Sequence, residues 1–465
     1  MSSKATNFER LPGGSSYGPS LTQSTASAVD ARKIWGFPEF FVVGQILAPA
    51  VLFLPGTQPL RVVIRTAPFL VSLAALFWYG RKSFHARLDA PAQKWLFLCS
   101  ICLMVMVFHP TTNSILAGGA HAMLYLSVLA PIFWAPQLKL TPERIQRLLF
   151  IILISCGLNS MVGVLQVYDP ATWMPRELSS MVTGMVGGIN NVSYIGPDGR
   201  TIIRPTGLSD NPGAVAGPAT AATLLGLIFF FERTRFWRRA AALLCAVAGF
   251  TVVFLTMVRT SLLVACGVLF AYIALLVLQK QKQKALMLFA VGVVTIIMSF
   301  SLALALGGQS IEDRVGTLFA DDPMTVYYSN RGAQIEYGFT TLLAQYPAGA
   351  GLGRWGMMRA YFGDESNLAS PSIWAELQPN AWILDGGLVL LLFYFLAVGG
   401  NTMSEIRMLR LAHSPALRFS TSAIAAVNLI TVALIFGYTP FTNQIGLQYW
   451  FLSGVLYNAA CNPVL

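Results

Sequence analysis

The chain has 465 residues, of which 55% are hydrophobic and only 11% are charged. Soluble domains carry about a quarter charged residues, so the composition excludes a string of soluble domains and predicts an all-α polytopic membrane protein. The net charge of +11 calls for no nucleic-acid partner, because basic residues commonly flank membrane spans on the cytoplasmic side.

The chain is predicted to consist of a short tail and one transmembrane domain. Residues 1–38 are rich in Ser, Gly, Thr and Pro, which is typical of a disordered cytoplasmic tail. Residues 39–465 contain about twelve apolar segments, each a predicted membrane span. These segments are 39–55, 62–80, 94–109, 115–134, 146–168, 210–231, 239–257, 260–279, 285–306, 380–400, 418–437 and 445–460.

The basic residues predict the orientation of these spans. The side that holds both termini has 21 of the 31 Lys and Arg residues, including all eight lysines, but only 7 of the 20 acidic residues. The other side has 13 acids, and its ten basic residues are all arginine. The positive-inside rule therefore places both termini in the cytoplasm. The arginine side is therefore predicted to face away from the cytoplasm.

Two predicted loops on the arginine side are long, 169–209 and 307–379. Loops of this length in a compact protein usually carry function. Both contain aromatic residues, which suit either the bilayer interface or stacking on sugar rings. The larger loop, between the ninth and tenth spans, is expected to be helical.

The first long loop ends in a segment with arginines, Arg200 and Arg204, directly before a span. Ser209 or Asp210 is the expected N-cap of that span, with Pro212 in its first turn. A helix N-terminus beside Arg204 would bind an anion. An arginine that only reaches lipid headgroups is the alternative.

Arg259 repeats this arrangement at the corner between the seventh and eighth spans. Thr260 or Ser261 is the expected cap of the eighth span. A charge so close to the membrane core is costly unless it is paired or functional, which favours a functional arginine.

The second long loop is predicted to hold an amphipathic surface helix over residues 330–347, capped by Asn330, stopped by Pro347 and carrying Arg331. A glycine-rich stretch follows and leads to Arg354 and Trp355. It is predicted to be a flexible turn that could bring backbone N–H groups and Arg354 near a ligand.

In this order, these features resemble the O-antigen polymerase and O-antigen ligase superfamily. The resemblance rests on Arg204-Pro-Thr-Gly207, Asn211-Pro-Gly213, Thr256-Met-Val-Arg259-Thr-Ser261, Arg331 before its helix, Pro347-Ala-Gly349-Ala-Gly351-Leu-Gly353 and Asn380-Ala-Trp-Ile-Leu384-Asp385-Gly-Gly387.

The resemblance implies a GT-C-like glycosyltransferase of a bacterial inner membrane, with both long loops in the periplasm. The implied substrate is an undecaprenyl-diphosphate-linked oligosaccharide, and no metal or cofactor is expected. A chain-length regulator and a flippase of the same pathway are possible partners, together with membrane lipids. The implied catalytic residues include Arg204, Arg259 and Arg331. The expected substrate-binding residues are Arg200, Asn211, Arg354, Trp355 and Asn380.

One departure separates the candidate activities. Ligases of this superfamily have a histidine beside the asparagine that opens the late span, but here the segment is Glu376-Leu-Gln-Pro-Asn380. The missing histidine favours a polymerase, with Glu376 as the catalytic base if partial burial raises its proton affinity. The alternatives are a ligase, a transporter of lipid-linked glycan, and a non-catalytic scaffold.

Overall fold

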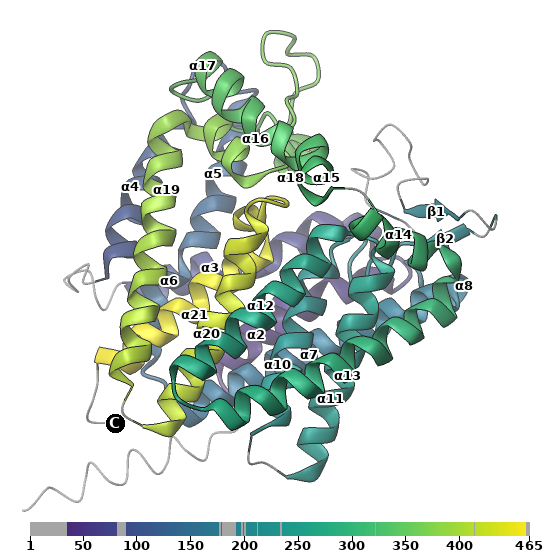
Figure 1. Ribbon diagram of the computed structural model, residues 1–465. Coiled ribbons are helices and arrows are strands. Elements are labelled where there is room, and N and C mark those ends of the chain that lie inside the picture. The colour runs from purple at the N-terminus through teal and green to yellow at the C-terminus, as the bar shows by residue number, and fades with distance from the viewer. Residues whose placement is uncertain are drawn as a thin grey trace, which may run out of the picture.

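The computed structural model of the protein describes residues 35–80, 90–175, 178, 192–196, 199, 201–211, 213–232, 235–320, 322–412 and 414–461. Most of the predicted tail, and Arg200, lie outside these residues. The described part of the chain is a helical bundle with one short β-hairpin (Figure 1). The all-α expectation is confirmed for the bundle, whereas the hairpin was not expected.

Each of the twelve apolar segments coincides with a helix. The bundle helices are α2 Phe37–Leu47 continued by η1 Ala48–Phe53, α3 Arg61–Gly80, α4 Pro91–Met106, α5 Ile115–Leu129 with α6 Pro131–Trp134 and η3 Ala135–Leu138, α7 Pro142–Tyr168, α10 Ala216–Phe230, α11 Phe236–Leu255, α12 Arg259–Leu278, α13 Lys282–Gly307, α19 Gln378–Leu411, α20 Pro415–Leu434 and α21 Gln444–Cys461.

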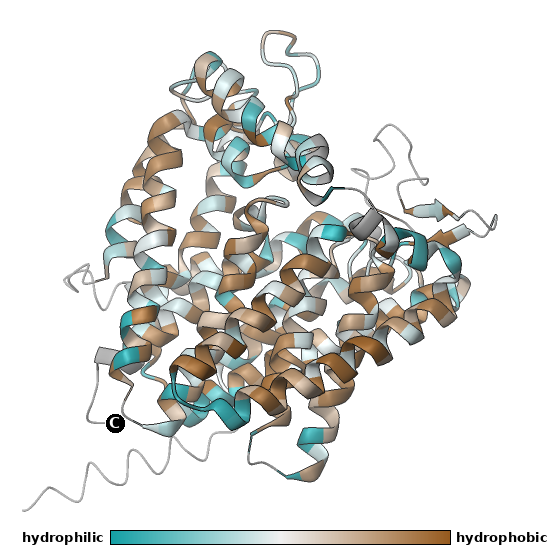
Figure 2. Ribbon diagram, in the orientation of Figure 1, coloured by the Kyte–Doolittle hydropathy of each residue, from teal (hydrophilic) through white to brown (hydrophobic). Residues whose placement is uncertain are grey.

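Eight of the described helices are long and apolar enough, by length and composition, to cross a membrane. Apolar residues dominate the middle of the bundle and polar residues gather towards its ends (Figure 2). These features fit a multi-pass membrane protein. The count of twelve spans stays a prediction.

The long loops meet the bundle at one end, which we call the loop end. There α7, α11 and α13 finish, and α3, α10, α12 and α19 begin. The first loop contains α8 Pro170–Trp173 and the antiparallel hairpin of β1 Ser193–Ile195 and β2 Thr201–Ile203. The second loop forms an outer layer of short helices over the loop end (Figure 1). These are α14 Gln309–Ala320, α15 Pro323–Tyr327, η5 Tyr328–Gly332, α16 Ala333–Tyr337, η6 Gly338–Leu342, α17 Leu343–Gln345 and α18 Gly356–Phe362.

The amphipathic helix of the second loop starts earlier than predicted. Helical structure runs from Pro323 to Gln345, with π-helical turns at η5 and η6. The side chain of Asp322 caps it and accepts a 2.9 Å hydrogen bond from the Thr325 N–H. The Asn330 cap was therefore wrong, whereas the stop before Pro347 is confirmed.

The glycine-rich stretch is a packing element. Helix α19 breaks at Gly386 and Gly387, where φ is −161° and +63°. The second loop fills the break: the Ala350 N–H donates to the Leu384 carbonyl at 2.6 Å, and the Leu388 N–H donates to the Pro347 carbonyl at 2.9 Å. Broken helix backbone inside a membrane bundle needs such protein partners. The stretch forms the expected turn, and these contacts hold it against α19.

A buried polar network joins α19, α20 and α21 at the other end of the bundle. Glu405 accepts hydrogen bonds from the amides of Asn401 and Asn428 at 2.9 and 2.6 Å, and Asn401 also contacts Tyr449 and Ser453. Because buried polar groups need partners, this network fixes the register of the three helices.

Candidate functional site

Three arginines converge at the loop end, and we call them the arginine corner: Arg204, Arg259 and Arg314. Arg259 and Arg314 line one small pocket between α12 and α14. The pKa of Arg314 is lowered by burial first, and then by the nearby positive charges of Arg259 and Arg204. Clustered positive charge of this kind favours the binding of an anion.

A tight backbone corner places Arg259. Helix α11 ends at Leu255, Met257 adopts a left-handed φ of +56°, and α12 begins at Arg259 itself. The N-cap is Val258, which has no side-chain hydrogen bond, so capping by Thr260 or Ser261 was wrong. The Arg314 Nε donates to the Met257 carbonyl at 3.1 Å and ties the outer layer to this corner.

Helix α7 holds the Arg204 segment in place. The buried amide of Gln166 accepts the N–H groups of Thr206 and Gly207 at 2.9 and 2.8 Å and donates to the Gly207 carbonyl at 2.7 Å. Asn159 accepts the Leu208 N–H at 2.8 Å. Gly207 has a φ of +63°, and a Cβ there would lie 2.0 Å from Asn159 Oδ1. Glycine is therefore required at position 207.

Asp210 has a different role from the predicted cap. Its buried carboxylate forms ion pairs with Arg61 and Arg65 at the start of α3, with 3.2 Å between Arg61 Nε and Asp210 Oδ2. Arg65 Nη1 also donates to the Tyr361 hydroxyl of the outer layer at 3.0 Å. Because α3 holds Asp210, α10 begins only at Ala216. Its cap is Val215, so a start at Ser209 or Asp210 was wrong.

Asn211 lies next to this ion pair. Its side-chain Oδ1 is buried and has no hydrogen-bond partner among the described residues. The Nε of Arg204 is also buried and has no hydrogen-bond partner among the described residues. Buried polar atoms without partners are costly, and both would gain from a polar ligand.

Arg331 pairs with Glu376 and not with the arginine corner. Their side chains form an ion pair, and Gln334 Nε2 donates to the same carboxylate at 2.7 Å. The amide of Asn380 donates to the Gln334 carbonyl at 2.9 Å. These four residues form a second polar cluster, which we call the Glu376 cluster, where the outer layer meets the start of α19.

Burial raises the pKa of Glu376, but hydrogen bonds from Arg331 and Gln334 and the charge of Arg331 outweigh it, so the net pKa is lowered. The expected rise in proton affinity was wrong, because Arg331 is the partner of Glu376 and its charge favours the ionised carboxylate.

Arg354 and Trp355 are both buried, with exposures of 4% and 6%. Arg354 donates to the carbonyls of Pro371 and Ala350 at 3.1 and 3.0 Å. The indole of Trp355 donates to Asp385 at 2.8 Å. These contacts hold the second loop to the bundle, which differs from the substrate contacts predicted for both residues.

Asp385 is the centre of a buried cluster at the break in α19. It also accepts the Tyr125 hydroxyl at 2.7 Å and lies 3.7 Å from His121 Nε2. His121 Nδ1 accepts the Gly353 N–H at 3.3 Å. His121 therefore packs against the glycine-rich stretch and helps to hold the second loop to the bundle.

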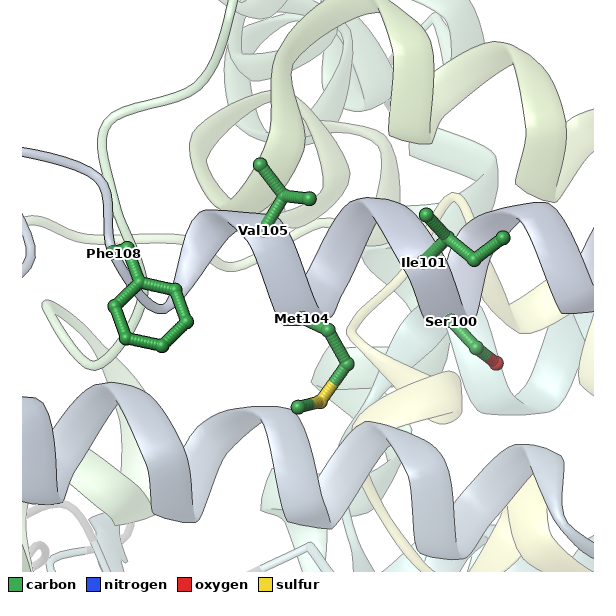
Figure 3. Close-up of a pocket in the computed structure, with 5 residues that line it drawn as sticks. All are labelled: Ser100, Ile101, Met104, Val105 and Phe108. Atoms are coloured by element: carbon green, nitrogen blue, oxygen red, sulfur yellow. The ribbon is translucent and has the colours of Figure 1, made fainter.

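A shallow apolar groove lies elsewhere, along α4 (Figure 3). It is lined by Ser100, Ile101, Met104, Val105 and Phe108. The Ser100 hydroxyl already donates to the Leu96 carbonyl at 2.9 Å. The groove has no charged residue and suits contact with lipid.

No known family model and no curated protein matches this chain.

Proposed function

We propose that the protein is a membrane glycosyltransferase of the O-antigen polymerase type. It would join undecaprenyl-diphosphate-linked oligosaccharide repeat units into an exopolysaccharide or O-antigen, at the periplasmic face of the inner membrane. The observation that carries this proposal is the arginine corner at the loop end of an apolar bundle. A carrier diphosphate would lie at this depth, where its lipid tail stays in the bilayer.

The proposed reaction uses the corner for the leaving group. The acceptor hydroxyl oxygen bonds to the anomeric carbon, the bond from that carbon to the diphosphate oxygen breaks, and the hydroxyl proton leaves to a base. The carrier departs as undecaprenyl diphosphate. Fixed guanidinium groups stabilise the charge that develops on it, since they need no reorganisation during the reaction. Their planar fork suits two phosphate oxygens.

The Glu376 cluster is the proposed acceptor side of the site. Glu376 remains the candidate base, and the bond to Arg331 keeps it ionised and able to accept a hydrogen bond from a hydroxyl. The same bond makes it a weaker base than expected. In this proposal Glu376 orients the acceptor and takes its proton only as the new bond forms.

A transporter of lipid-linked glycan is the second candidate. The observation that favours it is the pair of buried carboxyl groups on α19, Asp385 and Glu405, because ionisable groups inside a membrane bundle often serve transport. Both, however, lie in hydrogen-bonded clusters that hold elements together, and neither cluster contains a residue of the arginine corner.

Deletion of the gene, followed by analysis of lipid-linked glycans, separates these functions. A polymerase predicts accumulation of single repeat units on the carrier, accessible from the periplasm. Long chains still on the carrier would indicate a ligase instead. Single units confined to the cytoplasmic face would indicate a transporter, and unchanged lipid-linked glycans would contradict all three.

A further inference from the structure

Trp374 presents an exposed aromatic ring beside the Glu376 cluster. Its side chain is 64% exposed. It lies two residues before Glu376 in an extended segment, so both residues leave the chain on the same side. The ring faces are left to solvent, next to a carboxylate, a guanidinium and an amide.

Another exposed ring lies beside an acid on the helix that carries Arg331. The hydroxyl of Tyr328 donates to Glu336, and the Tyr328 ring is 52% exposed. Tyr337 and Phe339 are also exposed on this helical segment. The outer layer therefore presents several exposed rings, and the polar edge of Tyr328 lies beside an acid.

This surface is unsuited to the bilayer. Asp322, Glu336, Asp364 and Glu365 are exposed on the same layer. Hydrogen bonds from Thr325 to Asp322, and from Ser366 to Asp364, lower the pKa of these two carboxyls and keep them charged. Exposed carboxylates are repelled by anionic headgroups and are expensive to bring into hydrocarbon. Segment 363–377 also projects beyond α16 and α18 (Figure 1).

A sugar ring matches what the surface offers. Its C–H face can stack on an indole, which supplies a large rigid contact area with little loss of conformational freedom. Its hydroxyl groups can donate to a carboxylate and accept from a guanidinium or an amide. Trp374, Glu376, Arg331 and Gln334 place all of these groups together.

We propose that Trp374 and the Glu376 cluster bind one pyranose ring of the glycan acceptor, and that Trp374 is the stacking residue. This inference rests on the proposed function and adds to it the residue that holds the acceptor chain. The exposed rings of Tyr328 and Tyr337 extend the surface along the outer layer, as a chain longer than one unit would need.

The test uses the purified full-length protein in nanodiscs and oligosaccharides of one to four repeat units, released from the polysaccharide of wild-type cells. We expect Trp374→Ala to bind them about tenfold more weakly by calorimetry, the loss of one good aromatic contact. Trp374→Phe keeps a ring face and should lose less. Leu368→Ala, at an 88% exposed residue of the same loop, is the control and should bind normally. Wild-type affinity in Trp374→Ala, or no binding by the wild-type protein, would overturn the inference.

Two further measurements separate the outcomes. Arg259→Ala should bind the oligosaccharides normally yet make no polymer. Normal polymer production by Arg259→Ala would contradict the proposed function, independently of the binding measured for the Trp374 variants. A fluorophore at Trp374→Cys should not be quenched by nitroxide-labelled lipid headgroups. Strong quenching would show that residue 374 lies at the bilayer, and would overturn the glycan assignment alone.

Discussion

Arg65 and Asp210, 145 residues apart in the chain, form a buried ion pair at the loop end of the bundle. Arg65 also contacts Tyr361 of the outer layer. One residue at the start of α3 thus joins the segment that follows Arg204 to the second long loop. These two contacts hold both long loops to α3, and the position of the arginine corner depends on them.

Loss of the Asp210 charge should destabilise the protein strongly. Breaking a buried ion pair by removing one partner costs about 3–5 kcal/mol, since the remaining charge is left buried. We expect Asp210→Asn to lower the thermal unfolding temperature in detergent clearly. Asp169→Asn is the control, because Asp169 makes a local hydrogen bond to Thr172. Equal unfolding temperatures for the two variants would show that the pair is not structural.

Gly207→Ala should displace Arg204, whereas Gly213→Ala should not. Both glycines have positive φ, +63° and +76°, so both substitutions cost about 1 kcal/mol in backbone strain. Only at Gly207 does the new Cβ meet a neighbour, Asn159 Oδ1 at 2.0 Å, whereas nothing lies within 4 Å at Gly213. Polymer production at matched protein levels should fall in Gly207→Ala alone. Similar activity in both variants would show that the close approach of residue 207 to Asn159 does not position Arg204.

Arg314 should be as important as the two arginines found by sequence. We expect Arg314→Ala, like Arg204→Ala and Arg259→Ala, to abolish polymer while protein levels stay near normal. Arg314→Lys should also impair it, because an ammonium cannot fork two phosphate oxygens. Arg359→Ala is the control, since Arg359 donates to the Asp364 carbonyl within the loop. Full polymer in Arg314→Ala would exclude Arg314 from the site.

The Glu376–Arg331 ion pair should persist at neutral pH and fail only in acid. The pKa of Glu376 is lowered from its ordinary value of 4.5. A group with a lowered folded-state pKa stabilises the protein above its unfolded pKa, and that contribution is lost as the pH falls through the folded value.

We therefore expect wild type to unfold at a higher temperature than Glu376→Gln at pH 7. The difference should shrink only as the pH falls below about 4.5. A difference that already disappears between pH 6 and 7 would indicate a raised pKa, and with it the base originally predicted from sequence.

The sequence predicted the helices well and their ends less well. Long apolar runs need a helix in a membrane, so each of the twelve segments is helical in the structure. The start of α10 could not be foreseen, because it depends on Asp210 being held by arginines of a distant helix. Local capping rules describe a helix end only when no tertiary partner competes for the side chain.

The grouping of the candidate residues differs from the one that the sequence suggested. Arg204 and Arg259 both lie near Arg314, which the sequence did not single out, whereas Arg331 forms an ion pair with Glu376. Arg314 follows Glu312 and Asp313 in the chain, a context that suggests a local ion pair. Only the packing of α14 on the α11–α12 corner shows its position. The anchoring roles of Gln166 and Asn159 likewise depend on contacts across the fold.

We propose that the arginine corner holds the diphosphate of a lipid carrier. The most direct measurement is binding of undecaprenyl diphosphate to the purified protein in nanodiscs, for wild type, Arg204→Ala, Arg259→Ala, Arg314→Ala and the control Arg359→Ala. Removing one charge-assisted contact of about 1.5–3 kcal/mol should weaken binding at least tenfold. We predict this loss in the three corner variants and unchanged binding in the control. Equal affinity in all five proteins would contradict the account.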